Sequence, residues 1–368
     1  MCCARRQQQQ GLRCWVLEAA DEVGGRIRTD TVGGFRLDRG FQVLLTSYPE
    51  AKTILDYDAL DLKPFLPCAL VCYGGQFHEV TGLWRRPFGA IRSLRSPIGS
   101  FTDKLRVASF RSGSLRGTIE DHFRDPETTS LQALQDAGFS PSMIARFFRL
   151  FLGGIFLDSD LCAFSCMLSF LVRMFSLGNA CLPAEAMEAI PRQPRMGLPP
   201  GSIRLRSRVV RVGPGAVTLS TGEELSAKSV VVAVEGRMAA KLLGDTISQA
   251  GQGTTCLYFA APRPPIAQPL LVLNGDGRGP INNLCVPTGA APSYGPGGKS
   301  LVSVTILGTG NDPNRLLAEV CEHLGEWFGT VVQPSPRLSI NDLSRPIGCG
   351  PSPGACAGSC YCGLCGHP

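Results

Sequence analysis

The sequence predicts an α/β fold, and three observations support this prediction. Strong helix formers fill residues 3–10, Gly11 ends them, and a short apolar strand from Leu12 to Glu18 follows. The strand is followed by a turn that contains the run Gly24 to Arg26. Much later, the continuous apolar run from Val230 to Val234 is typical of a buried strand in a parallel sheet.

The first strand and its turn carry the residue types of a dinucleotide site. Glu18 ends the strand, where its carboxylate can accept hydrogen bonds from a ribose diol. Gly24 and Gly25 let backbone amides approach a pyrophosphate, and Arg26 offers it fixed donors. We interpret residues 3–18 as the helix and second strand of a βαβ unit. The first strand and its Gly-x-Gly-x-x-Gly turn would precede residue 1, so the unit is predicted to be incomplete. The glutamine run at 7–10 has a second reading, as a low-complexity tail.

The next elements follow from turn and cap signals. Residues 32–44 predict a β-hairpin region, and a capping box at Ser47 to Glu50 opens a helix that reaches Tyr57. Residues 64–80 predict a second hairpin around Gly74 and Gly75. Residues 85–125 favour helix and loop. Further helices are expected at 130–138, from 140 to about 153, and at 160–176.

The second half of the chain reads mostly as strands. Four prolines in Pro191 to Gly201 are expected to break the preceding helix. We then expect two helices, at 236–243 and 313–328. Strands are expected at 203–212, 216–219, 229–234, 254–260, 270–274 and 301–307. Residues 336–368 are predicted to be an irregular tail rich in cysteine, glycine and proline.

Composition narrows the class of protein. The net charge of +6 over 368 residues is small, and the arginines are scattered among acids, so no nucleic-acid footprint is expected. The longest uncharged part of the most apolar region, Leu161 to Val172, is too short to span a membrane. Eleven of the 16 cysteines are dispersed, which favours reduced thiols and an intracellular protein. The N-terminus lacks the apolar core of a secretory signal and weakly resembles a transit peptide.

No catalytic or metal cluster stands out in the sequence. The tail offers one Cys-x-x-Cys pair, Cys362 and Cys365, without a second pair at zinc spacing, so no metal site is expected. The four histidines lie far apart, and we assign no catalytic residue.

The sequence resembles the flavin amine oxidase superfamily, and in particular the amine-oxidase-domain proteins allied to phytoene desaturase and protoporphyrinogen oxidase. Glu18 and Ala19, followed by Val23 to Arg26 and Thr29, resemble the second FAD signature of that superfamily. Residues 37–43 resemble the stretch that runs beneath the flavin ring. Residues 182–191 resemble the segment that returns from the substrate domain, although Glu185 and Ala186 replace its usual glycines.

The resemblance implies a Rossmann-like FAD/NAD(P)-binding domain, here incomplete, with an inserted α+β substrate domain. The FAD domain would comprise residues 1–75 and 195–250, and the substrate domain residues 76–194 and 251–335. By the same resemblance, Glu18 would bind the adenosine ribose. Gly24, Gly25 and Arg26 would lie along the ribose and pyrophosphate. Gly40, Phe41 and Gln42 would approach the flavin, and the Val209 backbone would contact adenine.

The implied activity is an FAD-dependent oxidoreduction of the amine oxidase or desaturase type. Hydride would pass from a small apolar or amine substrate to flavin. The alternative is a truncated, non-catalytic homologue or fragment that no longer holds FAD, because both FAD-binding ends of the pattern are missing. The compartment, cytoplasm or plastid, is left open for the same reason.

Overall fold

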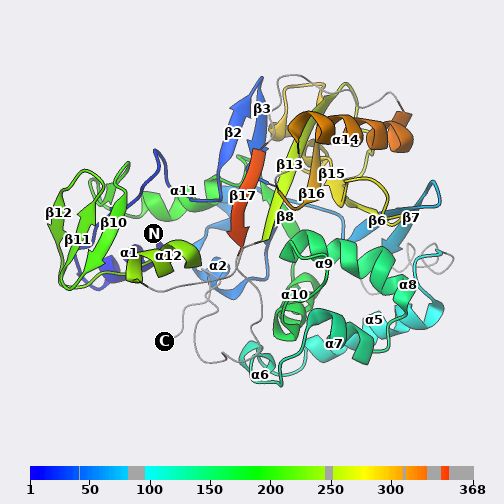
Figure 1. Cartoon of the computed structure of the whole chain (residues 1–368), viewed down its shortest axis with the longest axis horizontal. Coiled ribbons are helices and arrows are strands. Elements are labelled where there is room, and N and C mark those ends of the chain that lie inside the picture. Colours follow the sequence, from blue (N-terminus) through cyan, green and yellow to red (C-terminus); the bar gives the residue numbers. More distant parts are fainter. Residues whose placement is uncertain (41, 82–95, 245–251, 310–311, 330–340, 348–368) are drawn as a thin grey trace.

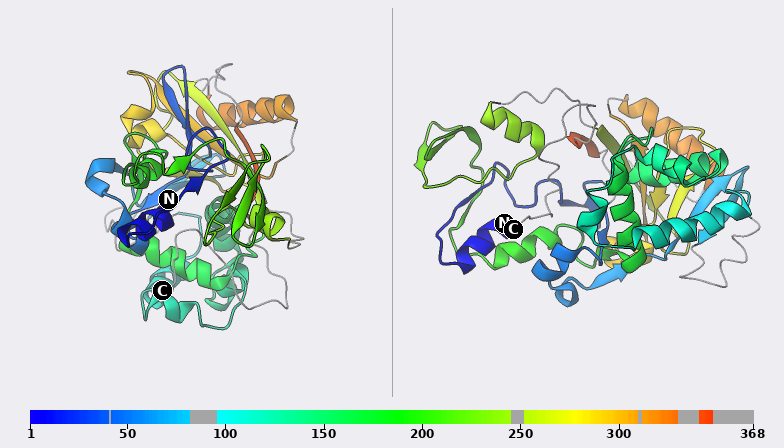
Figure 2. Two further views of the ribbon diagram at one scale, coloured as in Figure 1. Left: turned by 90° about the vertical axis from the view of Figure 1, so that its left-hand side faces the viewer. Right: turned by 90° about the horizontal axis from the view of Figure 1, so that it is seen from below.

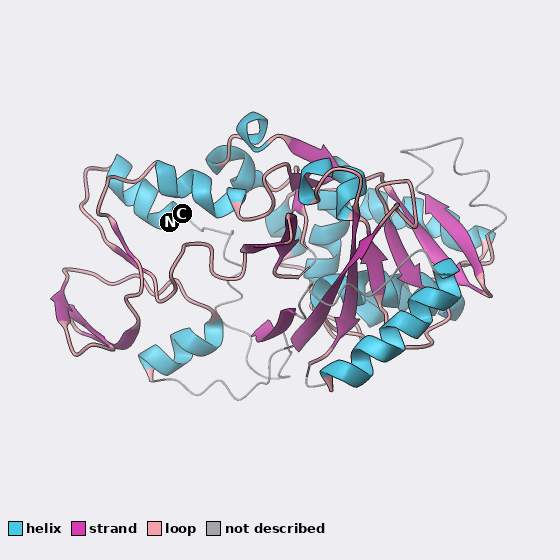
Figure 3. Cartoon of the chain, turned by 90° about the horizontal axis from the view of Figure 1, so that it is seen from above, coloured by secondary structure: helices cyan, strands magenta, loops and turns pink. Residues whose placement is uncertain are grey.

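The computed structural model describes residues 1–40, 42–81, 96–244, 252–309, 312–329 and 341–347. Within these ranges the chain forms two lobes (Figures 1 and 3). We call residues 1–28 and 197–244 the small lobe. The described parts of 62–177 and 252–347 form the large lobe. The remaining described segments join the two.

The large lobe is built on a mixed sheet. Among the described residues it has seven strands in the order β17-β13-β16-β15-β14-β6-β7, parallel only between β14 and β6. Its strands are β6 (Cys68–Tyr73), β7 (Gln76–Thr81), β13 (Gln252–Ala261), β14 (Leu271–Asn274), β15 (Asn283–Cys285), β16 (Ser300–Leu307) and β17 (Asn341–Ile347). The predicted hairpin at 64–80 is therefore confirmed as β6 and β7, with Gly74 and Gly75 at positive φ in the turn.

One face of this sheet packs on a single long helix. Asp312 caps α14 (Pro313–Phe328) by accepting a hydrogen bond from Arg315 N, as the Asp-Pro signal predicted. Leu316, Val320 and Leu324 on its apolar face pack against alternate residues of β13 and β16 such as Phe259 and Val304. Figure 1 shows α14 along this side of the sheet.

Helices cover part of the other side (Figure 1). They are α5 (Phe101–Ser114), α6 (Ile119–His122), α7 (Ser130–Asp136), α8 (Pro141–Met143), the π-helical turn η1 (Ile144–Phe148), α9 (Arg149–Phe156) and α10 (Ser165–Leu177). Phe148, Leu152 and Leu168 share a core with Val71 and Leu273 of the sheet. The aromatic side chains Phe147, Phe148 and Phe151 of these helices therefore belong to the core. The short elements α13 (Pro287–Ala290) and η2 (Pro292–Tyr294) follow β15; α13 contacts β16, and η2 contacts the strand at Phe35–Asp38.

The small lobe holds the helix and strand predicted at the start of the chain. Its elements are α1 (Cys2–Gln9), β1 (Val16–Leu17), β9 (Ile203–Arg204), β10 (Val209–Gly213), β11 (Ala216–Leu219), β12 (Glu224–Ser226) and α12 (Gly236–Leu243). β1 pairs in parallel with β9, and β10 to β12 form a meander.

The joining segments contain the predicted first hairpin. They are β2 (Thr29–Val32), β3 (Phe35–Asp38), β4 (Leu44–Leu45), α2 (Pro49–Ile54), α3 (Tyr57–Leu60), β8 (Ala180–Pro183) and α11 (Ala189–Met196). β8 pairs with β4 and with β5 (Leu62–Pro64), which belongs to the large lobe. Gly33 and Gly34, both at positive φ, make the turn between β2 and β3. α11 lies against α1, because a Cβ on Gly197 would be 3.3 Å from Arg5 Nε (Figure 2).

Three predictions of local structure were wrong. The expected strand from Ser229 to Val234 has no regular structure, and Val231 is 58% exposed. Among the described residues β1 pairs only with β9, so no strand lies beside this run to accept its hydrogen bonds. The prolines of 191–201 do not end the helix, because Pro191 and Pro194 both lie inside α11, a short helix. Residues 341–347, expected in the irregular tail, form β17.

Ser47 is also not the helix cap that the sequence predicted. The cap position is Tyr48, and Ser47 is buried and donates its hydroxyl to Met174 O of α10 at 2.6 Å. A tertiary contact has therefore replaced a local one. The rest of the predicted tail, and residues 82–95, lie outside the described residues.

Candidate functional site

Glu18 stands at the end of β1, as predicted. Its backbone N–H donates to Arg204 O at 3.0 Å, and its carbonyl accepts from Ser207 N at 2.8 Å, which extends the parallel pairing past β1 and β9. Its side-chain Oε1 accepts from Ala20 N at 2.8 Å, so the carboxylate is fixed by its own turn. The Ser207 contact brings Glu18 close to Val209, the half-buried first residue of β10.

Gly24 and Gly25 of the glycine turn differ in the space around them. Gly24 has φ of +116°, and a Cβ there would lie 2.5 Å from Ile27 O and 3.0 Å from Pro191 Cγ, so only glycine fits. Gly25 has φ of +58°, but a Cβ there would meet nothing within 4 Å. Gly24 therefore closes the turn against α11, and Gly25 faces open space. Arg26, next to it, is exposed.

The loop 38–42 follows β3 and holds the other predicted residues. Gly40 is buried with φ of +89°, a conformation that favours glycine. Phe41 lies outside the described residues. Gln42 is half-buried, and its Oε1 is a buried oxygen with no hydrogen-bond partner among the described residues. An unpartnered buried oxygen is costly, so this atom is available to a ligand.

Asp38 ends β3, within the stretch that resembles the one beneath the flavin ring, and it is buried. Its Oδ1 accepts from Thr29 Oγ1 and from Met187 N at 3.1 Å, and its Oδ2 accepts from Tyr294 Oη at 2.7 Å. Its backbone carbonyl accepts from Tyr258 Oη. The neighbouring Arg39 pairs with Asp30 instead, at 3.0 Å. Burial raises the pKa of the Asp38 carboxyl to about 6, although the hydrogen bonds from Thr29, Tyr294 and Met187 lower it.

The segment that precedes α11 ties the glycine turn to this loop. Met187 N contacts Asp38, and Pro191 packs on Gly24. Ala186 in the same segment has φ of +69° and is fully buried, a left-handed conformation that glycine adopts more easily. Glu185 forms an ion pair with Arg36 at 2.7 Å. Of the two substitutions for glycine noted in the sequence, Ala186 thus keeps a backbone conformation that suits glycine, whereas Glu185 is not at positive φ.

The structure therefore links some of the predicted residues. Glu18 binds Ser207, two residues before Val209, and residues 187–191 contact both Gly24 and Asp38. Sequence reasoning missed Tyr258, Tyr294 and Met187, which fix the loop from distant parts of the chain. No local pattern marks them, because each contact is made across more than 140 residues of sequence.

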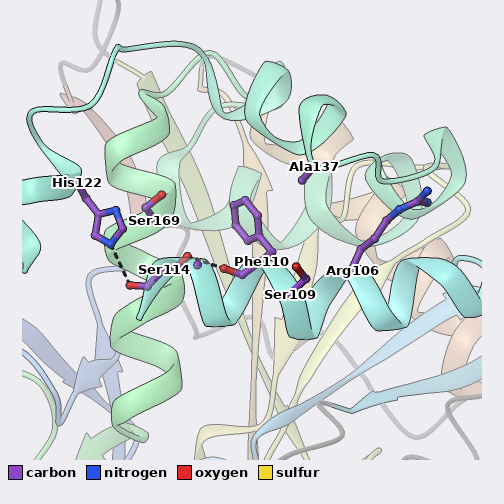
Figure 4. A pocket seen from close by; sticks show the side chains of 8 residues that line it. Arg106, Ser109, Phe110, Ser114, His122, Ala137 and Ser169 are labelled. Carbon is purple, nitrogen blue, oxygen red and sulfur yellow. Dashed lines mark hydrogen bonds between the residues drawn. The ribbon is translucent and has the colours of Figure 1, made fainter. Parts of the chain in front are cut away.

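A hollow of about 320 Å³ lies elsewhere, in the helical layer. Figure 4 shows it between α5 and its neighbours, with the Phe110 ring in the middle and His122 at one end. The His122 ring bonds to Ser114 O at 3.2 Å. None of the predicted cofactor residues lines this hollow.

Within the described residues, no group of three or more His, Cys, Asp or Glu side chains is placed to hold a metal ion. The tail cysteines lie outside those residues. No helix in the described part of the chain is both long and apolar enough to cross a membrane.

A parallel strand pair with an acid at its end, a glycine turn, and a second loop beside a separate sheet define a dinucleotide-binding α/β protein of the oxidoreductase type. The chain belongs to the flavin-containing amine oxidoreductases, because the model of that family matches residues 1–344. The family predicted from the sequence, its fold class and its flavin cofactor, FAD, are thereby confirmed.

Solved structures share the fold. An oxidoreductase from Methanosarcina mazei has a TM-score of 0.70 at 15% identity, covering 93% of this chain and 85% of that one. A triple mutant of putrescine oxidase has a TM-score of 0.67 at 15% identity, covering 92% and 81%. A protein from Exiguobacterium sp. 255-15, provisionally assigned as a protoporphyrinogen oxidase, has 0.67 at 14%, covering 93% and 83%. Among proteins of curated function, none matches the sequence significantly.

Proposed function

We propose that this chain transfers hydride from a C–N or C–C bond of a small apolar or amine substrate to bound FAD. The observation that carries the proposal is the joining of two sites: the strand end and glycine turn at Glu18 to Arg26 and the loop 38–42 meet through residues 187–191. When bound, FAD would supply the hydride acceptor, and O₂ or another acceptor would reoxidise it.

The residues present fit this cofactor. Gly25 leaves open space where any side chain would block an approaching pyrophosphate, and Gln42 Oε1 offers an unpartnered acceptor in the loop expected beneath the flavin. Glu18 is held by Ala20 N in a fixed position at the strand end. These are three independent local fits.

Each predicted residue has a proposed role. Glu18 binds the adenosine ribose, and Val209 contacts adenine through its backbone. Gly24, Gly25 and Arg26 lie along the ribose and pyrophosphate. Gly40, Phe41 and Gln42 approach the flavin. We name no catalytic side chain, because the chain's own task here is to orient the substrate and exclude water.

We also propose the division of the chain into an FAD domain of residues 1–75 and 195–250 and a substrate domain of 76–194 and 251–335. Support comes from the sheet, whose strands β13 to β16 all fall in the second of these substrate-domain ranges. β6 (Cys68–Tyr73) falls within the FAD-domain range but pairs in parallel with β14, so the sheet continues across the proposed boundary.

The test is a visible spectrum of the purified full chain, followed by denaturation and fluorescence of the released cofactor. Flavin absorbance and FAD in the supernatant support the proposal. If the protein is colourless, FAD is titrated in and the quenching of its fluorescence is followed. A soluble, folded chain that takes up no FAD in either experiment contradicts the proposal and favours a non-catalytic homologue.

A further inference from the structure

The Asp38 carboxyl group is a meeting point of segments that are far apart in the sequence. It is 4% exposed, at the end of β3. Its hydrogen-bond donors come from β2 (Thr29), from the turn before α11 (Met187) and from η2 (Tyr294). A further donor, Tyr258 of β13, binds the Asp38 carbonyl. Figure 1 shows the β2–β3 hairpin beside β13. The position of the end of β3 against the large sheet therefore depends on Asp38.

In the part of the chain that the structure describes, no cation forms an ion pair with this carboxyl group. The nearby arginines are engaged elsewhere: Arg39 with Asp30, Arg28 with Asp21, and Arg36 with Glu185 and Ala184 O. The other titratable or charged groups that act on this cluster are Tyr258 and Cys256 of β13, Tyr294 of η2, Cys285 of β15, Glu188 before α11 and Arg36 of β3. An ionised Asp38 is thus held by hydrogen bonds alone, in a place that water does not reach.

The hydrogen-bond partners of the two Asp38 carboxyl oxygens determine which of them is protonated in the neutral acid. Oδ1 faces Met187 N–H, which can only donate, and Thr29 Oγ1, which already accepts from Glu188 N at 3.3 Å. Oδ2 faces the Tyr294 hydroxyl, which can either donate or accept. A proton taken from water therefore resides on Oδ2, and Tyr294 turns from donor to acceptor.

We propose that Asp38 is a pH-dependent positioning residue of the flavin site proposed above: its neutral form donates from Oδ2 to Tyr294 and holds the end of β3, from Asp38 to Gly40, against the sheet, and its ionisation loosens that hold. The proposal rests on the proposed function only through the identity of this segment as the flavin-facing one. Asp38 itself is given no contact with substrate or cofactor.

The sign of the effect follows from linkage. Burial raises the pKa of Asp38 from 3.8 to about 6 in the packed arrangement, while unpacking would return the carboxyl group to water and to its ordinary pKa. The packed form is therefore most stable at low pH and becomes less stable as the pH rises from about 4 to about 6. If FAD needs the packed form, its dissociation constant should rise between pH 5 and pH 8, by up to about tenfold.

Two variants separate charge from shape. Asp38→Asn imitates the neutral acid, since its amide oxygen can accept at the Oδ1 position and its NH₂ can donate to Tyr294. It should bind FAD at pH 8 as tightly as the wild type does at pH 5, with little change between the two. Tyr294→Phe removes the acceptor of the proton and should weaken FAD binding at both pH values. Asp136→Asn, an exposed acid on α7, is the matched control and should behave as wild type.

FAD fluorescence quenching and urea unfolding, each at pH 5 and pH 8, complete the test. In the unfolding series the wild type should lose stability relative to Asp38→Asn as the pH rises, with or without FAD. If wild type, Asp38→Asn and Asp136→Asn show the same pH dependence in unfolding, the proposal is overturned. If no protein binds FAD but Asp38→Asn alone removes the pH dependence of unfolding, the positioning role stands and the proposed function fails.

Discussion

The large and small lobes contain similar apolar β-branched runs with opposite outcomes. Val302 and Val304 of β16 are fully buried between β13 and β15. Val231, in a run of equal apolar character, is 58% exposed and has no regular structure, and Val210 in β10 is 52% exposed. An apolar run therefore becomes a buried strand only where other strands pair with both of its edges and other elements cover its two faces.

A charged side chain placed at each run tests the difference in burial between the two lobes most directly. Val304→Asp should cost about 3–5 kcal/mol in the free energy of unfolding, because it leaves an unpaired carboxylate in a closed core. Val231→Asp, at an exposed site, should stay within about 0.5 kcal/mol of the wild type. Urea unfolding of both variants checks this. Equal losses would show that the small-lobe run is buried in solution after all.

The large lobe holds its own buried acid in the opposite way to Asp38. Asp103 is fully buried and accepts from Ser100 N at 2.7 Å, Ser140 N at 2.8 Å and Ser140 Oγ at 2.6 Å. Although burial raises its pKa, the hydrogen bonds from Ser140 and Ser100 outweigh this and lower it to about 2. A depressed pKa contributes stability that is present above about pH 4 and is lost as the pH falls towards 2.

Asp103→Asn should therefore cost about 2 kcal/mol at pH 7. The gap to the wild type should narrow at pH 3. Denaturant midpoints at the two pH values measure it, and a gap that widens at low pH would contradict the assigned charge state.

The smallest expected effect lies in the segment between the lobes. Ala186→Gly relieves a left-handed backbone but loses one buried methyl group and adds chain entropy, so the net change should be below about 0.5 kcal/mol. Ala69→Gly in β6, buried and without a positive φ, should cost about 1 kcal/mol. Thermal unfolding compares the two. An equal loss at both positions would remove the argument that residue 186 suits glycine.

Local signals predicted much of the fold. Asp312 before α14, the Gly74-Gly75 turn and the apolar alternation of β13 and β16 each act over a few residues, so the sequence displays them. The end of β1 at Glu18 was predicted for the same reason. The prediction of a strand from Val230 to Val234 was wrong, because the sequence of an apolar run does not show whether another strand lies beside it to pair with it.

The candidate site was predictable only in part. Glycines at 24 and 25 are visible in the sequence, and their positive φ values agree with the expected turn. The burial of Asp38, and its contacts with Tyr258 and Tyr294, depend on segments more than 200 residues away. Such contacts follow from the packing of the joining segments on the sheet, which no short pattern encodes.

The flavin site itself is tested most directly by two alanine variants with the same backbone strain. Gly25 and Gly33 both have φ of +58° and empty surroundings, so Gly25→Ala and Gly33→Ala cost similar stability. FAD affinity is then measured by fluorescence quenching for both and for the wild type. We expect Gly25→Ala to weaken FAD binding at least tenfold and Gly33→Ala to leave it unchanged. Equal affinity of the two variants, at equal stability, would contradict a pyrophosphate site at the glycine turn.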